Sequence, residues 1–431
     1  MNAINESWVS ASGTDVLRLI TAGSVDDGKS TLIGRLLYDS KGVFADQLAS
    51  IARSKYKRTQ ASEIDLALLT DGLEAEREQG ITIDVAYRYF ATPLRKFIVA
   101  DAPGHEQYTR NMVTGASTAQ VVIILIDASR AADGQLLPQT KRHSALAQLL
   151  GLQHVIVAVN KMDLVGWDGQ VFERIGKAYA DLAQTLGIPS FHVVPISALK
   201  GDNVVDVSGN TPWYDGPPLL SLLETLPVAA ADTSVSSRFF VQWVIRHGGS
   251  QREDFRGYAG QLSGGALKVG DEIKVLPSGL TARVARLLRG ADDLSFAAGG
   301  DSVTLVLDRD IDVSRGDLVV PADAQLRVVR EFDAELCWLD QQALNPARQY
   351  WLKQGTRLTH ARIKAVHTRR DMHALQHVQA GDILNMNDIG HATLVSRDLL
   401  ALDSYAGNAA TGAFILIDAA THQTAAAGMV R

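Results

Sequence analysis

The chain of 431 residues contains a single cysteine, Cys337. One cysteine cannot form an internal disulfide, so the class of small, disulfide-stapled secreted domains is excluded. Its apolar neighbours, in the run AELCWL, predict a buried core thiol in a reducing cytosol.

Long hydrophobic runs are also missing. No stretch reaches 18 uncharged apolar residues, and residues 1–15 have neither a basic start nor an apolar core of signal-peptide length. We therefore expect a cytoplasmic protein that is not exported and has no membrane contact.

The chain has no excess of positive charge. Lys and Arg number 42 against 48 Asp and Glu, which gives a net charge of −6 and argues against nucleic-acid binding through a broadly basic surface. With 46% hydrophobic and 21% charged residues the composition is that of a globular protein. The length exceeds what one hydrophobic core supports and predicts two or three domains.

Short apolar runs alternate with longer helical stretches from about residue 16 to 228. This alternation is typical of a mostly parallel sheet with helices on both faces, and we assign it to an α/β domain over residues 1–228. A proline and small residues around 226–237 indicate a linker. Beyond it, short alternating runs between Gly, Asp and Pro turns predict two all-β barrel domains, residues 236–326 and 327–431.

The segment GSVDDGKST follows a predicted strand and opens a predicted helix, which is the context of a phosphate-binding loop, or P-loop. Backbone N–H groups and the helix N-terminus attract phosphate there, Lys29 is expected to reach the β and γ phosphates, and Ser30 to ligate Mg²⁺. The nucleotide-binding residues predicted in this segment are Gly23, Ser24, Val25, Asp26, Asp27, Gly28, Lys29, Ser30 and Thr31.

Three further motifs, DAPG, NKMD and SAL, follow in order, each at the end of a predicted strand. Asp101 is expected to hold the Mg²⁺ shell and Gly104 to approach the γ-phosphate. Asp163 can accept from the ring N–H and the exocyclic amine of guanine, a pair of donors that adenine lacks. A backbone N–H of the SAL motif can reach the guanine carbonyl. The predicted nucleotide-binding residues are Asp101, Ala102, Pro103, Gly104, His105, Asn160, Lys161, Met162, Asp163, Ser197, Ala198 and Leu199.

Each motif alone is compatible with an ordinary turn or helix cap. Together, GSVDDGKST, GITID at residues 80–84 and DAPGHEQYTRNMVTGAS resemble the translational GTPase superfamily, which includes elongation factor Tu. The resemblance implies a GTP/GDP-binding P-loop GTPase domain followed by two barrels. It also implies that Thr82 closes over Mg²⁺ and the γ-phosphate and that His105 orients the attacking water.

The implied catalytic residues are thus His105, Thr82 and Lys29, and the implied Mg²⁺ ligands are Ser30, Thr82 and Asp101. The same resemblance matches Val25 and Ile81 to two apolar residues that flank the histidine as a gate. It places a monovalent cation beside Asp26.

Longer strings narrow the resemblance. GSVDDGKSTLIGRLLYDS, with Asp27 where elongation factor Tu has a histidine, is similar to the family of large subunits of bacterial sulfate adenylyltransferase, as are LEAEREQGITIDVAYRYF and WLKQGTRLTHARI. This implies a GTP-hydrolysing regulatory subunit in at least a heterodimer with a small catalytic nucleotidyltransferase subunit, which joins ATP and sulfate into adenosine 5′-phosphosulfate and diphosphate. The chain holds one phosphate loop, so adenylylsulfate kinase activity is not expected in it.

Two other functions stay open at this point: a translation factor that carries aminoacyl-tRNA, and a GTP switch without enzymatic coupling. A basic cluster, Arg53, Lys55, Lys57 and Arg58, favours a solvated helix face over a partner contact. Trp213 and Tyr214 in a turn-rich loop indicate local packing.

Overall fold

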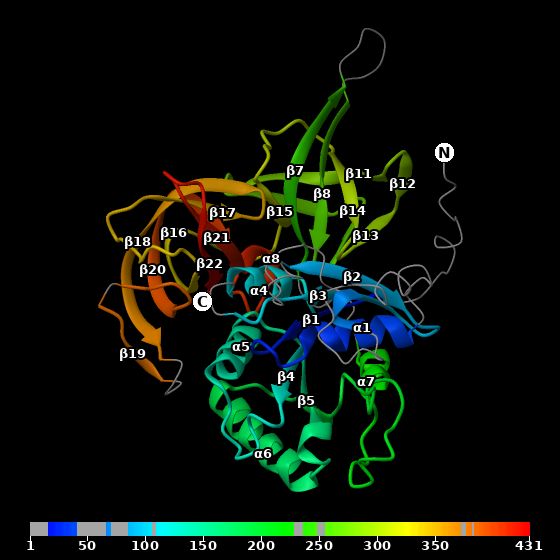
Figure 1. The fold of residues 1–431 in the computed structure, drawn as a ribbon. Helices are drawn as coiled ribbons and strands as arrows, with labels where there is room; N and C mark the ends of the chain where they lie inside the picture. Colours follow the sequence, from blue (N-terminus) through cyan, green and yellow to red (C-terminus); the bar gives the residue numbers. More distant parts are fainter. Residues whose placement is uncertain are drawn as a thin grey trace. The chain divides into compact units, whose positions relative to one another are not determined.

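The computed structural model describes residues 16–40, 66–69, 85–105, 109–227, 236–247, 255–371, 376–381 and 383–431. They divide into two compact units, with the change between Val228 and Ala229, and each unit is described by itself (Figure 1). Ile81 and Thr82, the basic cluster at 53–58 and most of the predicted linker lie outside the described residues.

The first unit is built on a six-stranded sheet in the order β2-β3-β1-β4-β5-β6. All neighbouring strands are parallel except β2, which runs antiparallel to β3 at one edge. The mostly parallel sheet expected from the sequence is therefore confirmed. The strands are β1 (Val16–Ala22), β2 (Ala86–Ala91), β3 (Lys96–Asp101), β4 (Val121–Asp127), β5 (His154–Asn160) and β6 (His192–Pro195).

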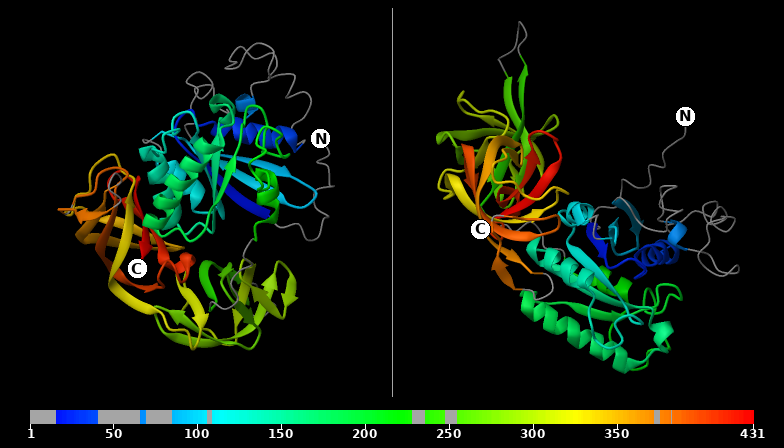
Figure 2. Two further views of the ribbon diagram at one scale, coloured as in Figure 1. Left: turned by 90° about the horizontal axis from the view of Figure 1, so that it is seen from below. Right: turned by 60° about the vertical axis from the view of Figure 1, so that its left-hand side comes forward.

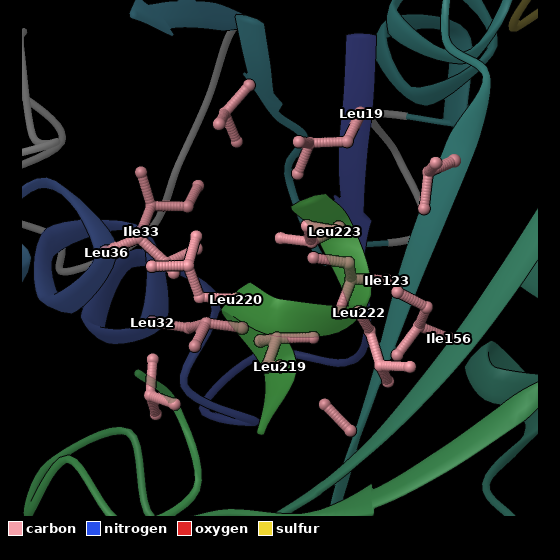
Figure 3. Close-up of a cluster of buried hydrophobic side chains, with 14 of the residues drawn as sticks. Leu19, Leu32, Ile33, Leu36, Ile123, Ile156, Leu219, Leu220, Leu222 and Leu223 are labelled. Carbon is pink, nitrogen blue, oxygen red and sulfur yellow. The ribbon is translucent and has the colours of Figure 1, made fainter. Parts of the chain in front are cut away.

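Helices cover both faces of this sheet, as predicted. On one face, leucines and isoleucines of α1 and α7 pack on Leu19, Ile123 and Ile156 of the strands (Figure 3). On the other face α4 lies against β1, where a Cβ added to Gly115 would meet Ile20 Cδ1 at 2.9 Å, and α5 packs on β4. The helices are α1 (Lys29–Asp39), α4 (Thr109–Ala116), α5 (Pro138–Leu149), α6 (Gly169–Leu186) and α7 (Leu219–Thr225), with 3₁₀ turns η2 (Leu66–Leu69) and η4 (Met162–Val165).

The loop before α7 packs locally, as its aromatic residues indicated. The Phe172 ring lies 5.2 Å from the ring of Trp213 and 6.0 Å from that of Tyr214, between ring centroids. The Trp213 indole donates to the Trp167 carbonyl at 3.0 Å. These contacts tie the loop to the start of α6.

The second unit contains two six-stranded antiparallel barrels, as the alternating runs predicted (Figure 2). The first follows the order β10-β15-β7-β8-β14-β11 and closes through β10 and β11, with β12 added to β11. Its strands are β7 (Arg238–His247), β8 (Phe255–Ser263), β10 (Glu272–Leu276), β11 (Leu280–Arg289), β12 (Asp292–Leu294), β14 (Ser302–Leu307) and β15 (Leu318–Pro321), and beside them β9 (Ala266–Lys268) pairs with β13 (Phe296–Ala298).

The second barrel follows the order β17-β21-β22-β16-β20-β18 and closes through β17 and β18. Cys337 lies in β16 and is 1% exposed, so the buried core thiol is confirmed. The elements are β16 (Arg327–Trp338), β17 (Tyr350–Gln354), β18 (Arg357–Arg370), β19 (His377–Gln379), β20 (Ile389–Leu402), α8 (Ala409–Gly412), β21 (Ala413–Asp418) and β22 (Thr424–Val430).

Contacts between the two barrels include two ion pairs, Arg238–Asp403 and Arg357–Asp317, and a small apolar cluster. The Arg238 guanidinium donates from Nε and Nη2 to the two carboxylate oxygens of Asp403, at 2.8 and 3.1 Å. Leu318 of the first barrel packs with Ala401 of the second in a buried cluster. None of the helices in the described part of the chain has the length and hydrophobicity needed to cross a bilayer.

Candidate nucleotide-binding site

The phosphate-binding loop connects the end of β1 at Ala22 to the start of α1 at Lys29. Gly28, the residue before the helix, has a φ of 92°, in the left-handed region that favours glycine. A Cβ there would also collide with the Asn160 amide nitrogen. Gly28 is therefore required both by its backbone conformation and by the close approach of β5.

The Lys29 side chain is folded back onto the loop that precedes it. Its Nζ donates to the Ser24 carbonyl at 2.8 Å and to the Gly23 carbonyl at 3.1 Å, and the residue is 7% exposed. Burial lowers the pKa of Lys29, while the negative charges of Asp101, Asp27 and Asp26 act in the opposite direction. The ammonium group is thus held at the phosphate loop by backbone oxygens and flanking carboxylates.

Gly104 of the DAPG segment lies against the phosphate loop. A Cβ added to it would meet the Gly23 carbonyl oxygen at 2.8 Å and the Ser24 carbonyl carbon at 2.9 Å, as well as Lys29 Nζ. Asp101, at the end of β3, is 1% exposed and accepts from the Thr21 hydroxyl at 3.4 Å. The structure therefore brings the first two predicted motifs together at the carboxyl ends of neighbouring strands.

Asn160 connects three of the predicted motifs. Its side-chain amide donates to the Asp27 carbonyl at 2.8 Å, and its side-chain oxygen accepts from the Ala198 N–H at 2.9 Å. The N–H of Ala198 is already used in this way, so a guanine carbonyl would have to be reached by another N–H of the SAL segment. Of the predicted residues Ser197, Ala198 and Leu199, Ala198 therefore does not offer its N–H to a guanine carbonyl while this bond is kept.

Lys161 and Asp127 form an ion pair beside Asn160. The Lys161 backbone has a φ of 63°, and its Nζ lies 2.7 Å from Asp127 Oδ2. Burial would raise the pKa of Asp127, but hydrogen bonds from Lys161 and from Ser129 hold it below its usual value. The ion pair thus fixes the end of the Lys161 side chain, and the buried Met162 and the half-buried Asp163 follow Lys161 at the start of η4.

Several residues that complete the site belong to none of the predicted motifs. Arg35 of α1 donates to the Ala198 carbonyl at 3.2 Å and to the Leu199 carbonyl, and so holds the SAL segment. Gln139 of α5 donates to the Gly104 carbonyl at 3.1 Å. Asp127, the partner of Lys161, also lies outside the predicted motifs, although it had a visible signal because it ends an apolar strand in the same way as Asp101.

The other predicted residues differ in exposure. Ser30 and Thr31 are half-buried in the first turn of α1, and Val25 is half-buried in the loop before it. Asp26 is exposed with a φ of 68°, and His105 is exposed directly after the DAPG segment. Pro103 and Ala102 are buried between Asp101 and Gly104. The positions of Thr82 and Ile81 are not among those described.

The chemistry of the site fits a magnesium ion shared with a triphosphate. Ser30 offers a hydroxyl oxygen and the buried Asp101 a carboxylate, and Mg²⁺ takes oxygen ligands, usually from one or two protein groups plus substrate phosphates. Within the described ranges no group of three or more His, Cys, Asp or Glu side chains is placed to hold a metal. An all-protein cage is therefore not what these residues provide.

Comparison with known proteins gives consistent matches. The family model described as the elongation factor Tu GTP binding domain matches residues 14–231, and the GTP-eEF1A C-terminal domain-like model matches residues 331–431. The chain is 49% identical over 419 residues to sulfate adenylyltransferase subunit 1 of Laribacter hongkongensis, covering 97% of this chain and 85% of that protein. The corresponding protein of Erwinia tasmaniensis is 48% identical over 429 residues, 99% of this chain and 88% of its own length.

A longer relative, the bifunctional enzyme CysN/CysC of Mycobacterium tuberculosis, is 51% identical over 418 residues, which are 97% of this chain and 67% of that protein. Among solved structures, the Saccharomyces cerevisiae Ski7 GTPase-like domain, bound to GTP, aligns over the whole of both chains with a TM-score of 0.54 and 16% identity. That likeness is one of fold.

Proposed function

Because the chain belongs to the sulfate adenylyltransferase subunit 1 family, with a GTP-binding domain of the elongation factor Tu type, we propose that it is the GTP-hydrolysing regulatory subunit of sulfate adenylyltransferase. The observation that carries the proposal is the match to subunit 1 relatives along almost the full chain, barrels included. The elongation factor match by itself leaves the reaction that GTP serves unspecified.

In this proposal the loop at residues 23–31 wraps the phosphates, and Lys29 leaves the Gly23 and Ser24 carbonyls to contact the β and γ phosphates. Asp163 pairs with the guanine edge. Ser30, Asp101 and Thr82 would hold Mg²⁺, which neutralises charge on the β and γ phosphate oxygens when bound.

His105 orients a water whose oxygen bonds to the γ-phosphorus while the bond from that phosphorus to the β–γ bridging oxygen breaks. The products are GDP, which keeps the former bridging oxygen, and inorganic phosphate, which contains the oxygen of the water and takes up its protons. The exposure of His105 supports this role, since a water-positioning residue must be able to meet the substrate. A monovalent cation at the exposed Asp26 belongs to the same proposal.

The partner we propose is a small catalytic nucleotidyltransferase subunit that makes adenosine 5′-phosphosulfate, in at least a heterodimer in the cytoplasm, without nucleic acid. The subunit 1 names of the relatives support the existence of a partner. Coupling requires two nucleotide-dependent states, and the segment around Thr82 and the one from Gly104 to about Ala116 are the proposed switching elements.

The direct test is adenosine phosphosulfate formation by the reconstituted pair, with and without GTP. We expect GTP to raise the yield or rate of adenosine phosphosulfate formation. Lys29→Ala should remove nucleotide binding. His105→Ala should keep GDP binding and slow GTP hydrolysis by about 10²-fold or more, the usual contribution of a general acid–base group. An unchanged rate in the His105 variant overturns its role. GTP-dependent capture of charged tRNA, with no effect on sulfate activation, overturns the function itself.

The role of Asp163 has its own test. In Asp163→Asn, a carboxylate that only accepts hydrogen bonds is replaced by an amide that can also donate them. The variant should therefore pair with a base that carries a carbonyl in place of the guanine amine. We expect the variant to lose GTP affinity by about 10²-fold or more and to gain affinity for xanthosine triphosphate, measured by nucleotide competition. Unchanged preference for GTP would show that another group reads the base.

A further inference from the structure

Asp27 is the residue at which the phosphate loop departs from the elongation factor pattern, and its carboxylate is buried. The residue is 0% exposed, and its Oδ2 accepts from the Ser24 N–H at 2.5 Å. Its other oxygen, Oδ1, has no hydrogen-bond partner among the described residues. A buried carboxylate with an unsatisfied oxygen is costly, so a compensating charge is expected near it.

Lys29 supplies one such charge from within the loop, and Arg130 supplies a second from outside it. Its Nη1 lies 3.6 Å from Asp27 Oδ1 and also donates to the Val25 carbonyl at 3.1 Å. Arg130 comes from the segment after β4 and is separated from Val25 by 105 positions, so the contact depends on the fold. One guanidinium therefore meets both a backbone oxygen and a side chain of the phosphate loop.

The bond to the Val25 carbonyl fixes a peptide plane. In a trans peptide the C=O and the following N–H point in opposite directions. Holding the Val25 carbonyl towards Arg130 therefore turns the Asp26 N–H to the other side of the loop. Asp26 has a φ of 68°, and a left-handed residue among ordinary ones is how successive N–H groups are made to converge on an anion.

We propose that Arg130 is a positioning residue of the nucleotide site: by bridging the Val25 carbonyl and the Asp27 carboxylate, it holds the phosphate loop in its anion-binding conformation before the nucleotide arrives. The inference rests on the proposed nucleotide binding. In this proposal Arg130 supports the binding of GTP and of GDP equally, because it makes no contact with the γ-phosphate.

The test measures GDP and GTP affinity, and GTP hydrolysis at saturating GTP, for the full chain carrying Arg130→Ala. We expect the affinity for both nucleotides to fall on the order of tenfold, the usual effect of losing a hydrogen bond to a charged group, with kcat nearly unchanged. Arg130→Lys keeps the charge but not the planar fork, so it should recover only part of the affinity.

A matched control is Arg174→Ala. Arg174 of α6 donates from Nε to the Ala132 carbonyl at 3.0 Å, so its contact is with the same segment after β4 and not with the Val25 carbonyl. It should bind both nucleotides like the parent chain. If it weakens binding as much as Arg130→Ala does, the effect is a general loosening of the segment and the positioning role is wrong.

The coupling between the two side chains gives a second readout. Asp27→Asn removes the charge that Arg130 faces, so the double variant Asp27→Asn/Arg130→Ala should lose less affinity than the product of the two single losses. Strict additivity contradicts the bridge. A fall in kcat with unchanged affinity would instead make Arg130 a transition-state arginine, and failure of the parent chain to bind GDP would refute the proposed function rather than this inference.

Discussion

Gly104 lies so close to the phosphate loop that its missing side chain decides how the two segments pack. Two backbone atoms of the phosphate loop would lie under 3.0 Å from a Cβ at this position, and backbone cannot move aside as a flexible side chain can. We expect Gly104→Ala to displace the loop and lower GTP affinity about tenfold or more, since overpacking typically costs 1–3 kcal/mol. Nucleotide titration checks this. Gly209→Ala, where a Cβ meets nothing within 4 Å, should bind GTP normally.

His143 of α5 makes the stability of the chain depend on pH. Burial, followed by the charges of Lys29 and Arg142, lowers the pKa of His143 from 6.5 to about 3. As the pH falls below 6.5 the unfolded chain binds this proton and the folded chain does not, so stability is lost down to about pH 3.

The loss should approach about 1.4 kcal/mol per pH unit within that window. Chemical denaturation at pH 7 and pH 5 measures this loss of stability. In His143→Gln, the part of the difference in stability between the two pH values that comes from this histidine should be absent. Replacement of the exposed His192 by Gln should leave the pH dependence as it is in the parent chain. Equal slopes for the parent chain and His143→Gln would contradict a neutral buried imidazole.

Residues that bear local signals were predictable, and residues that act at a distance were not. Lys29, Asp101 and Asn160 each follow or begin a recognisable element, so their convergence could be deduced from the order of strands in an α/β sheet. Arg35, Gln139 and Arg130 reach the site across 35 to 164 positions of sequence. Nothing in their neighbours marks them, because an arginine or glutamine on a helix or in a loop is ordinarily a solvated surface residue.

At the scale of the elements, β2 shows where pattern reading fails. Its sequence AYRYFA has no continuous Val, Ile or Leu run, and the strand lies at the sheet edge with Tyr87 and Tyr89 exposed. The five parallel strands, of which β3, β1, β4 and β5 are inner and β6 forms the other edge, read as apolar runs, whereas β2 has only one apolar face. The parallel sheet was thus predictable, and the antiparallel strand was not.

Two helical glycines should respond oppositely to the same change. A Cβ on Gly176 in α6 meets nothing within 4 Å, so Gly176→Ala should stabilise the chain by about 0.5–1 kcal/mol through helix propensity. A Cβ on Gly34 in α1 would collide with the Leu66 carbonyl, whose carbon lies at 2.7 Å, so Gly34→Ala should destabilise it. Urea unfolding of both variants decides this, and a gain in stability for Gly34→Ala would mean that η2 moves freely away from α1.

At the scale of the whole molecule, the order of one α/β domain and two barrels could be deduced from the change in periodicity after residue 228. The contacts that join the two barrels could not be deduced from the sequence. Arg238 is 5% exposed and pairs with Asp403, 165 positions away, through two hydrogen bonds. Thr411 adds a hydrogen bond to the same carboxylate at 2.5 Å. The barrels are thus linked by a bidentate ion pair between a buried arginine and a half-buried aspartate, in addition to the apolar cluster around Leu318 and Ala401.

Removal of one partner of this pair should strongly lower the free energy of unfolding of the second unit. Arg238→Ala leaves the Asp403 carboxylate without its guanidinium; breaking a fully buried pair on one side costs about 3–5 kcal/mol, and the cost is smaller here because the Asp403 side chain is 17% exposed. The exposed pair Arg286–Asp293 has the same bidentate geometry, at 2.8 and 2.9 Å, and is the matched control. Arg286→Ala should leave the denaturation midpoint almost unchanged, because water screens exposed pairs. Equal shifts for the two variants would mean that the other contacts, the apolar cluster and the Arg357–Asp317 pair, hold the barrels together, and that Arg238 contributes no more than a surface charge.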